Sequence, residues 1–320
     1  MVDTAQVKNE RPEFSVLITC YQEEHSIEEF YAKLSGALER FGRTYEIIFV
    51  NDGSTDRTFD KLKEIYHRDS HVRAVIDLFK NAGQQAAITA AIEEARGRAF
   101  VLLDSDLQLD PAEFPILAAE YDRGYDVVSG YRRNRRDSLF RVIPSKLANM
   151  IMRRASNSAF RDFGCTFKIY NAELVRAFQY GPLHIFSNVD LIARAQRCIE
   201  VPVTHYPRKY GKSGWTLQKL WKYNMDNVVK LSQRPFQILA VLCVCTSVLF
   251  LLRMLAGPFI PFRVLDEVTN GLILNALAFS LLVLVAILSL IGEFAIRCFV
   301  SLQQTPVYIV KEKLERGGGA

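Results

Sequence analysis

The chain has 320 residues, which is enough for one large domain with an appendage or for two domains. Its 40 Lys and Arg residues exceed its 35 Asp and Glu residues by only five, so the overall charge gives no reason to expect a nucleic-acid partner. Six cysteines without a Cys-x-x-Cys pair predict free thiols in a reducing compartment. The polar first eleven residues predict no signal peptide.

The first hundred residues alternate apolar strands with helices. We expect strands over 14–19, 45–50, 72–78 and 99–103, and helices over 26–41, 56–67 and 86–95. This alternation is typical of βαβ units, so we predict an α/β fold with a mostly parallel sheet flanked by helices. No Gly-x-Gly-x-x-Gly follows the first strand and no P-loop motif occurs, which argues against a Rossmann dehydrogenase and a P-loop NTPase.

Each predicted strand ends in a polar cluster. The carboxyl ends of parallel strands meet at one edge of a sheet, where open α/β sheets bind ligands. Asp52 follows the second strand. It contacts the base or ribose of a nucleotide, or it caps the helix that follows, and spacing alone leaves both interpretations open.

The fourth predicted strand ends in two carboxylates, Asp104 and Asp106. Alternate residues of an extended segment point the same way, so both side chains can face one point. Two hard oxygen ligands there suit Mg²⁺ or Mn²⁺ carrying a diphosphate. Taken alone, the pair is more simply a set of solvated loop acids, but its place at the end of a strand favours a ligand site.

A basic segment follows, with five arginines within ten residues: Arg132, Arg133, Arg135, Arg136 and Arg141, before Ser145 and Lys146. Such a run is often a solvated loop. Arginine forks also suit phosphate, and we favour a seat for the phosphate of a membrane-bound acceptor.

Two apolar segments, 236–252 and 271–292, are each close to the roughly 20 residues that span a bilayer. They predict two transmembrane helices; two buried helices of a soluble core are the alternative. The segment 211–235 mixes Trp and Lys and predicts an interfacial helix, or else an ordinary surface helix. Basic residues precede the first apolar segment and follow the second, and basic residues favour the cytoplasmic side. We therefore expect the first domain and both termini in the cytoplasm.

The predicted organisation is therefore a cytoplasmic α/β domain over 1–210, an interfacial segment over 211–235, a transmembrane hairpin over 236–292 and a cytoplasmic tail over 293–320. The expected location is the inner (cytoplasmic) membrane.

The ordered motifs at 21–23, 50–56, 81–84 and 103–108 resemble the family 2 inverting glycosyltransferases with the GT-A fold. The two apolar segments, with Gly292-Glu293-Phe294 after the second, resemble the polyprenyl-phosphate branch. That branch includes dolichol-phosphate mannose synthases and undecaprenyl-phosphate glucosyl- and aminoarabinose-transferases.

The resemblance implies roles for particular residues. The metal is implied to lie on Asp104, Asp106 and Gln108, and the nucleotide sugar on Tyr21, Glu23, Asp52, Gln84 and Asp104. The acceptor phosphate is assigned to Arg132, Arg135, Arg136, Arg141, Ser145 and Lys212. Asp106 and Asp162 are the catalytic candidates; some relatives carry a catalytic Asp where this chain has Thr166, and Asp162 is the nearest carboxylate.

The predicted activity is transfer of a sugar, with inversion and with Mg²⁺ or Mn²⁺, from a UDP- or GDP-linked donor to polyprenyl phosphate of the undecaprenyl type. A homo-oligomer is compatible with the resemblance, and the sugar is not identified. A processive polysaccharide synthase is one alternative, although its Gln-x-x-Arg-Trp motif is missing. A non-catalytic scaffold that binds lipid phosphate is another.

Overall fold

The computed structural model describes residues 11–133, 160–178, 185–210 and 306–317, together with Met150, Arg153, Cys245 and separate positions between 273 and 299. The chain divides into two compact units. The first comprises Met1–Leu231 and Pro306–Ala320, and the second Ser232–Thr305. The chain therefore leaves the first unit and later returns to it.

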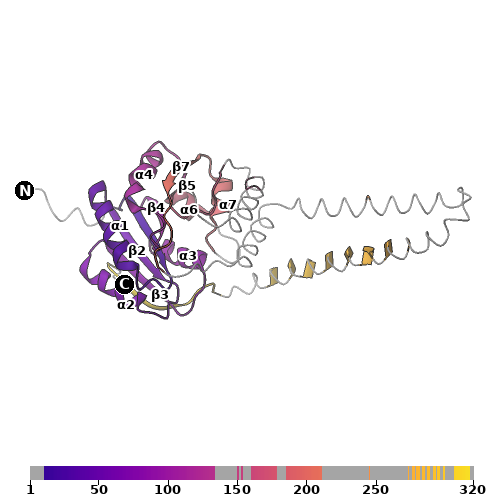
Figure 1. Cartoon of the computed structure of the whole chain (residues 1–320), viewed down its shortest axis with the longest axis horizontal. Coiled ribbons are helices and arrows are strands. Elements are labelled where there is room, and N and C mark those ends of the chain that lie inside the picture. The colour runs from indigo at the N-terminus through magenta and orange to yellow at the C-terminus, as the bar shows by residue number, and fades with distance from the viewer. Residues whose placement is uncertain are drawn as a thin grey trace, which may run out of the picture. The chain divides into compact units, whose positions relative to one another are not determined.

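A mixed sheet forms the centre of the first unit (Figure 1). In the described part of the chain its order is β7-β5-β6-β4-β1-β2-β3-β8. The strands are β1 (Phe14–Cys20), β2 (Tyr45–Asn51), β3 (Val72–Leu78), β4 (Ala99–Asp104), β5 (Val127–Arg133), β6 (Lys168–Asn171), β7 (Cys198–Thr204) and β8 (Val310–Glu315). Only β6 and β8 run against the other six of these strands. The predicted parallel strands are confirmed as the core β4-β1-β2-β3, and the two reversed strands make the sheet mixed.

Helices cover both faces of this sheet. One face packs on α1 (Ile27–Phe41), α2 (Thr58–Arg68) and α4 (Phe114–Asp122), the last following a short 3₁₀ turn, η2 (Pro111–Glu113). The other packs on α3 (Gln84–Glu94), α6 (Ala172–Ala177) and α7 (Asn188–Arg194). Alternate residues of β1 serve the two faces, because Val16 and Ile18 join one apolar cluster and Leu17 joins the other. Two-sided burial explains why β1 and β4 are apolar at most positions on both faces.

The predicted membrane segments fall largely outside the described residues. Within the described part of the chain, no helix is both long enough and apolar enough to cross a bilayer. The segment 211–235 is not described, 236–252 is described only at Cys245, and 271–292 only at separate helical positions.

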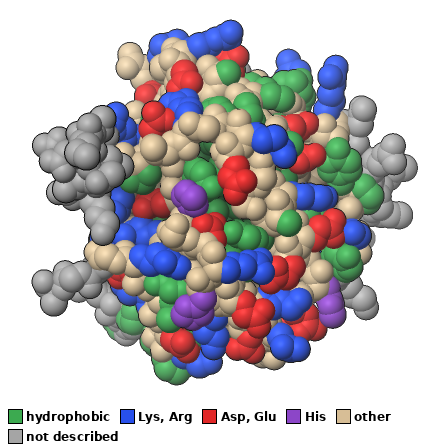
Figure 2. All heavy atoms as spheres, turned by 90° about the vertical axis from the view of Figure 1, so that its left-hand side faces the viewer, with side chains coloured by type: hydrophobic (Ala, Val, Ile, Leu, Met, Phe, Trp, Pro, Cys, Tyr) green, Lys and Arg blue, Asp and Glu red, His purple; other side chains and the backbone are tan. Residues whose placement is uncertain are grey.

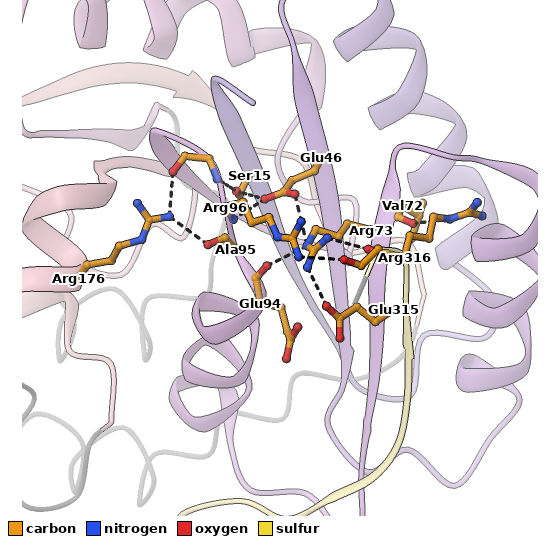
Figure 3. A network of polar contacts seen from close by, with 12 residues as sticks. Ser15, Glu46, Val72, Arg73, Glu94, Ala95, Arg96, Arg176, Glu315 and Arg316 are labelled. Atoms are coloured by element: carbon orange, nitrogen blue, oxygen red, sulfur yellow. Dashed lines mark hydrogen bonds and ion pairs between the residues drawn. The ribbon is translucent and has the colours of Figure 1, made fainter. Parts of the chain in front are cut away.

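The returning chain forms β8, which pairs antiparallel with β3. Figure 3 shows the polar contacts that fasten it. Arg73 of β3 binds the Glu315 carboxylate at 2.8 Å and the Arg316 carbonyl at 2.8 Å, and it lies 3.6 Å from Glu46. Its Nε also donates to the carbonyl of Glu94 at 3.1 Å. A largely buried guanidinium thus joins β3, the end of α3 and the returning strand.

Figure 2 shows one face of the molecule, on which acidic and basic side chains are interspersed. Neither sign dominates this view, in keeping with the small net charge of +5.

Arg73→Met should destabilise the first unit by about 3 kcal/mol, because it leaves buried acidic and carbonyl oxygens without their cation. Urea unfolding of the purified chain, followed by circular dichroism, measures the change. Lys33→Met on α1 is the control, because its exposed i,i+4 ion pair with Glu29 should cost less than about 1 kcal/mol. Equal losses in the two variants would contradict this assignment.

Candidate active site

The carboxyl ends of β1, β2, β3, β4, β5 and β7 lie at one edge of the sheet, because these strands share one direction. This edge brings together most of the predicted site residues that the structure describes. They are Tyr21 and Glu23 after β1, Asp52 after β2, Gln84 after β3, Asp104 and Asp106 at β4, and Arg132 in β5.

Asp104 ends β4 and is held by neutral donors. Gln84 Nε2 donates to its Oδ1 at 2.6 Å, and the Thr166 hydroxyl is also hydrogen-bonded to it. Burial, followed by the charge of Asp106, raises the pKa of Asp104 to about 7. The two carboxylates therefore repel each other, and their convergence on one metal stays a prediction.

Asp106 is held by a cation and a backbone amide. Its Oδ2 accepts from Arg208 Nη2 at 2.6 Å, and its Oδ1 accepts from the Gln108 amide at 3.1 Å. Leu107 reaches the left-handed region with φ of 60°, which turns the Gln108 amide back toward Asp106. The Gln108 carbonyl accepts from the Tyr206 amide at 2.9 Å, so the segment that follows β7 holds this turn in place.

Arg208 also lies 3.5 Å from Glu23 Oε1 and so bridges two acidic groups. Glu23 is buried, and burial raises its pKa despite hydrogen bonding to Ser26. Arg208 and Thr166 were missed as site residues by sequence reasoning. Arg208 is 102 positions from Asp106, and no local pattern predicts that contact.

Asp52 fastens a neighbouring loop. Its two carboxylate oxygens accept the amides of Ala82 at 2.7 Å and Gly83 at 3.0 Å. Burial raises its pKa, and the two amide hydrogen bonds offset part of that effect. The prediction that Asp52 caps the helix after β2 is wrong, because α2 begins at Thr58 without a side-chain cap and Asp52 instead binds the backbone just before α3. This places Gln84, the next residue, against Asp104.

Gly53 explains why a small residue follows Asp52. Its φ is +65°, and a Cβ there would lie 2.2 Å from the carbonyl carbon of Lys80. The loops after β2 and β3 therefore touch through backbone. Tyr21 stands at the same edge, half exposed.

Arg132 and Asp162 form one bidentate ion pair. Arg132 Nε lies 2.7 Å from Asp162 Oδ2, and its Nη2 lies 2.8 Å from Oδ1. Burial alone raises the pKa of Asp162, but the hydrogen bonds and charge of Arg132 outweigh it and lower the pKa. A carboxylate held in this way is a weak base. A predicted general base and a predicted phosphate ligand are therefore bound to each other.

Buried Lys168 supports the loop that carries Asp162. Its ammonium donates to the carbonyls of Cys165 and Phe163, and burial lowers its pKa. The same loop presents Thr166 to Asp104. The other predicted acceptor residues, Arg135, Arg136, Arg141, Ser145 and Lys212, lie outside the described residues.

The oxygen atoms of Asp104 and Asp106 supply part of the ligand set that a divalent cation needs. The two carboxylates repel each other, a further positive charge would reduce that repulsion, and carboxylate oxygens suit Mg²⁺ or Mn²⁺. Over the described ranges no group of three or more His, Cys, Asp or Glu residues gathers as a metal set. A cation here would thus need further oxygens from an amide side chain or from a bound diphosphate.

The fold and this edge together define an α/β transferase with a GT-A-like sheet. Residues 15–178, just over half of the chain, match "Glycosyl transferase family 2". The chain belongs to that family, and the predicted family and fold are confirmed to this extent.

Two solved structures of one synthase show the same fold at low identity. Glucosyl-3-phosphoglycerate synthase from Mycobacterium tuberculosis, in complex with phosphoglyceric acid, is 18% identical with a TM-score of 0.51, over 68% of this chain and 79% of that chain. The same synthase with Mn²⁺, UDP and glucosyl-3-phosphoglycerate is also 18% identical with a TM-score of 0.51. That match covers 68% of this chain and 77% of that chain. TarS from S. aureus with UDP-GlcNAc is 19% identical with a TM-score of 0.45, and the match covers 68% of this chain and 65% of that chain.

Asp104→Asn should stabilise the metal-free protein increasingly as pH rises. An acid whose pKa is raised on folding binds more protons when folded, so its ionisation costs stability between its ordinary pKa of 3.8 and about 7. Asparagine has no such charge and can still accept from Gln84. In EDTA, the Tm advantage of the variant should therefore grow from pH 5 to pH 8. Asp60→Asn, on the exposed side of α2, should show no growth; parallel curves for both variants would refute the expectation.

Arg132→Gln should destabilise the protein by about 3 kcal/mol, because Asp162 then remains buried without its cation. Arg133→Gln removes the adjacent, exposed arginine and should have little effect on stability. Denaturant unfolding of both variants measures the difference. If Arg132→Gln unfolds like the wild type, the arginine does not serve the fold, and its role is confined to ligands.

Proposed function

We propose that the protein transfers a sugar from a UDP- or GDP-linked donor to polyprenyl phosphate, with inversion and with Mg²⁺ or Mn²⁺, at the cytoplasmic face of the inner membrane. The carboxylate pair at the end of β4, in a family 2 glycosyltransferase domain, carries this proposal. The apolar segments that continue from the same domain support the lipid acceptor.

On the donor side, Asp104, Asp106 and Gln108 would hold the metal. The similarly folded mycobacterial synthase has been crystallised with Mn²⁺ and UDP, which supports a metal and a nucleotide here. A bound divalent cation supplies neutralisation of the charge that develops on the departing diphosphate. Arg208 stands beside Asp106 as a second cation, and its planar guanidinium suits a phosphate.

On the acceptor side, the site favours a group that is already anionic. Position 166 holds a threonine hydroxyl, and Asp162 is engaged by Arg132. A sugar hydroxyl would need a base, whereas a phosphate monoester is ionised near pH 7. Positioning of that phosphate in line with the donor then accounts for much of the rate.

Two observations favour a membrane location. Nine large apolar side chains described between 273 and 299 are helical and between 37% and 66% exposed, whereas Ile287 is less exposed, and a helix with so much exposed apolar surface suits lipid. They are Ile273, Leu277, Phe279, Leu281, Leu284, Leu288, Ile291, Phe294 and Phe299. The chain also leaves the first unit and returns to it, so any crossings between must be even in number. Two crossings, with domain and tail on one side, satisfy this condition.

Asp106→Asn should lower transfer to undecaprenyl phosphate by at least about 100-fold, because a metal ligand and a partner of Arg208 are changed together. Purified protein is assayed with Mg²⁺ or Mn²⁺ and a panel of UDP- and GDP-sugars, following lipid-linked product. Asp110→Asn is the control, since Asp110 only caps the turn at Ala112 and asparagine caps equally well.

Unchanged turnover of Asp106→Asn would sink the metal role. A polymeric product would instead identify a processive synthase. Absence of both nucleotide-sugar binding and metal binding, measured by titration calorimetry, would identify a scaffold.

A further inference from the structure

Exposed apolar side chains of the first unit gather at the edge that carries the site. Among the residues described there, seven large hydrophobic side chains are exposed. Five of them follow or begin strands at the carboxyl edge: Tyr21, Phe79, Tyr206, Ile309 and Val310. The other two are Ile116, on α4, and Met150. Since isolated exposed apolar residues are ordinary, it is the clustering at one edge that needs an explanation.

Three of the five lie next to one another where β3 ends and β8 begins, and we call them the apolar corner: Phe79, Ile309 and Val310. The Phe79 amide donates to the Ile309 carbonyl at 3.0 Å, and Val310 pairs with Leu78 in the β3·β8 ladder. Their exposed fractions are 64% for Phe79, 57% for Ile309 and 40% for Val310. Residues 230 positions apart in the sequence (79 and 309) thus present one apolar surface.

Two lysines and one glutamate lie beside the apolar corner. Lys80 follows Phe79 and is exposed, and Lys311 follows Val310 with its ammonium 3.3 Å from Asp77. Glu312 is exposed on the same strand. Flexible lysines beside an apolar wedge can extend toward phosphate headgroups while the wedge enters the acyl boundary.

We propose that the apolar corner inserts into the interfacial layer of the bilayer and thereby holds the carboxyl edge of the sheet against the lipid surface. The proposal rests on the proposed function for the presence of a membrane. It adds a lipid contact on the catalytic domain itself, separate from the predicted segments 211–235 and 236–292. The partner is a lipid surface, recognised through apolar insertion with a small contribution from charge.

Lipid fits this surface better than another protein does. Only six residues separate Phe299, the last described apolar helical position, from Pro306, where the first unit resumes. An embedded segment would therefore keep the returning strand near the bilayer. Three side chains also fall well short of the roughly 800 Å² per partner of a stable protein interface.

The contact has a consequence for the reaction. Asp104 ends β4 and Asp106 follows two residues later, at the same edge of the sheet as the apolar corner. An acceptor phosphate that lies in the headgroup layer would then meet the donor site without leaving the membrane. The apolar corner is in this sense a positioning surface, because none of its residues touches the carboxylate pair in the described structure.

Photocrosslinking of the full chain in bilayer nanodiscs tests the contact without relying on activity. A benzophenone amino acid is placed at position 79 or 309, with position 116 as the matched exposed apolar control. Irradiation followed by mass spectrometry should give lipid adducts at 79 and 309 in several-fold excess over 116. Equal adducts at all three positions, or a crosslinked dimer in place of lipid adducts, would overturn the proposal.

A kinetic test separates this proposal from the proposed function. The double variant Phe79→Ser with Ile309→Ser should raise KM for undecaprenyl phosphate in bilayers several-fold and leave kcat for a water-soluble short-chain phosphate unchanged. Ile116→Ser should change neither. If the wild type transfers no sugar to any lipid phosphate, the proposed function fails while crosslinking still reports on the apolar corner. If transfer occurs but the double variant behaves as wild type, the apolar corner alone is refuted.

Discussion

The placement of two carboxylates at the end of a buried apolar strand constrains much of the surrounding structure. Charge in such a place is costly, and burial with mutual repulsion raises the pKa of Asp104 to about 7. Four groups bind these carboxylates and offset part of this cost: Gln84, Thr166 and Arg208 from distant parts of the chain, and the Gln108 amide from the adjacent turn. The edge is thus organised around an unfavourable interaction that a ligand could relieve, as is common where a fold carries function.

The loops beside the pair illustrate how one contact depends on another. Asp52 holds the amides of residues 82 and 83, and only then can Gln84 meet Asp104. Gly53 permits the close approach of the two loops that this requires. The polar clusters that follow successive strands therefore form one connected set of hydrogen bonds.

Ion pairs fix the remaining parts of the first unit. Arg132 with Asp162 anchors the loop that presents Thr166, and Arg73 with Glu315 anchors the returning strand to β3. Both arginines are largely buried. Each therefore stabilises the fold mainly by neutralising a carboxylate that would otherwise be covered without a cation. The returning strand also reaches the edge that carries the site, because β8 begins beside Phe79 at the carboxyl end of β3.

The amino-acid sequence by itself determined the strands β1 to β4, the helices between them and the edge at which Asp52, Asp104 and Asp106 meet. Those features follow from local periodicity and from the rule that parallel strands end together. Tertiary structure alone decided that Arg208 binds Asp106, that Arg132 binds Asp162, and that a charged segment at 310–315 completes the sheet. The physical reason is that ion pairs and edge strands depend on groups up to 242 positions apart, and neither a salt bridge nor an exposed Lys-Glu-Lys strand leaves a periodic apolar pattern in the sequence.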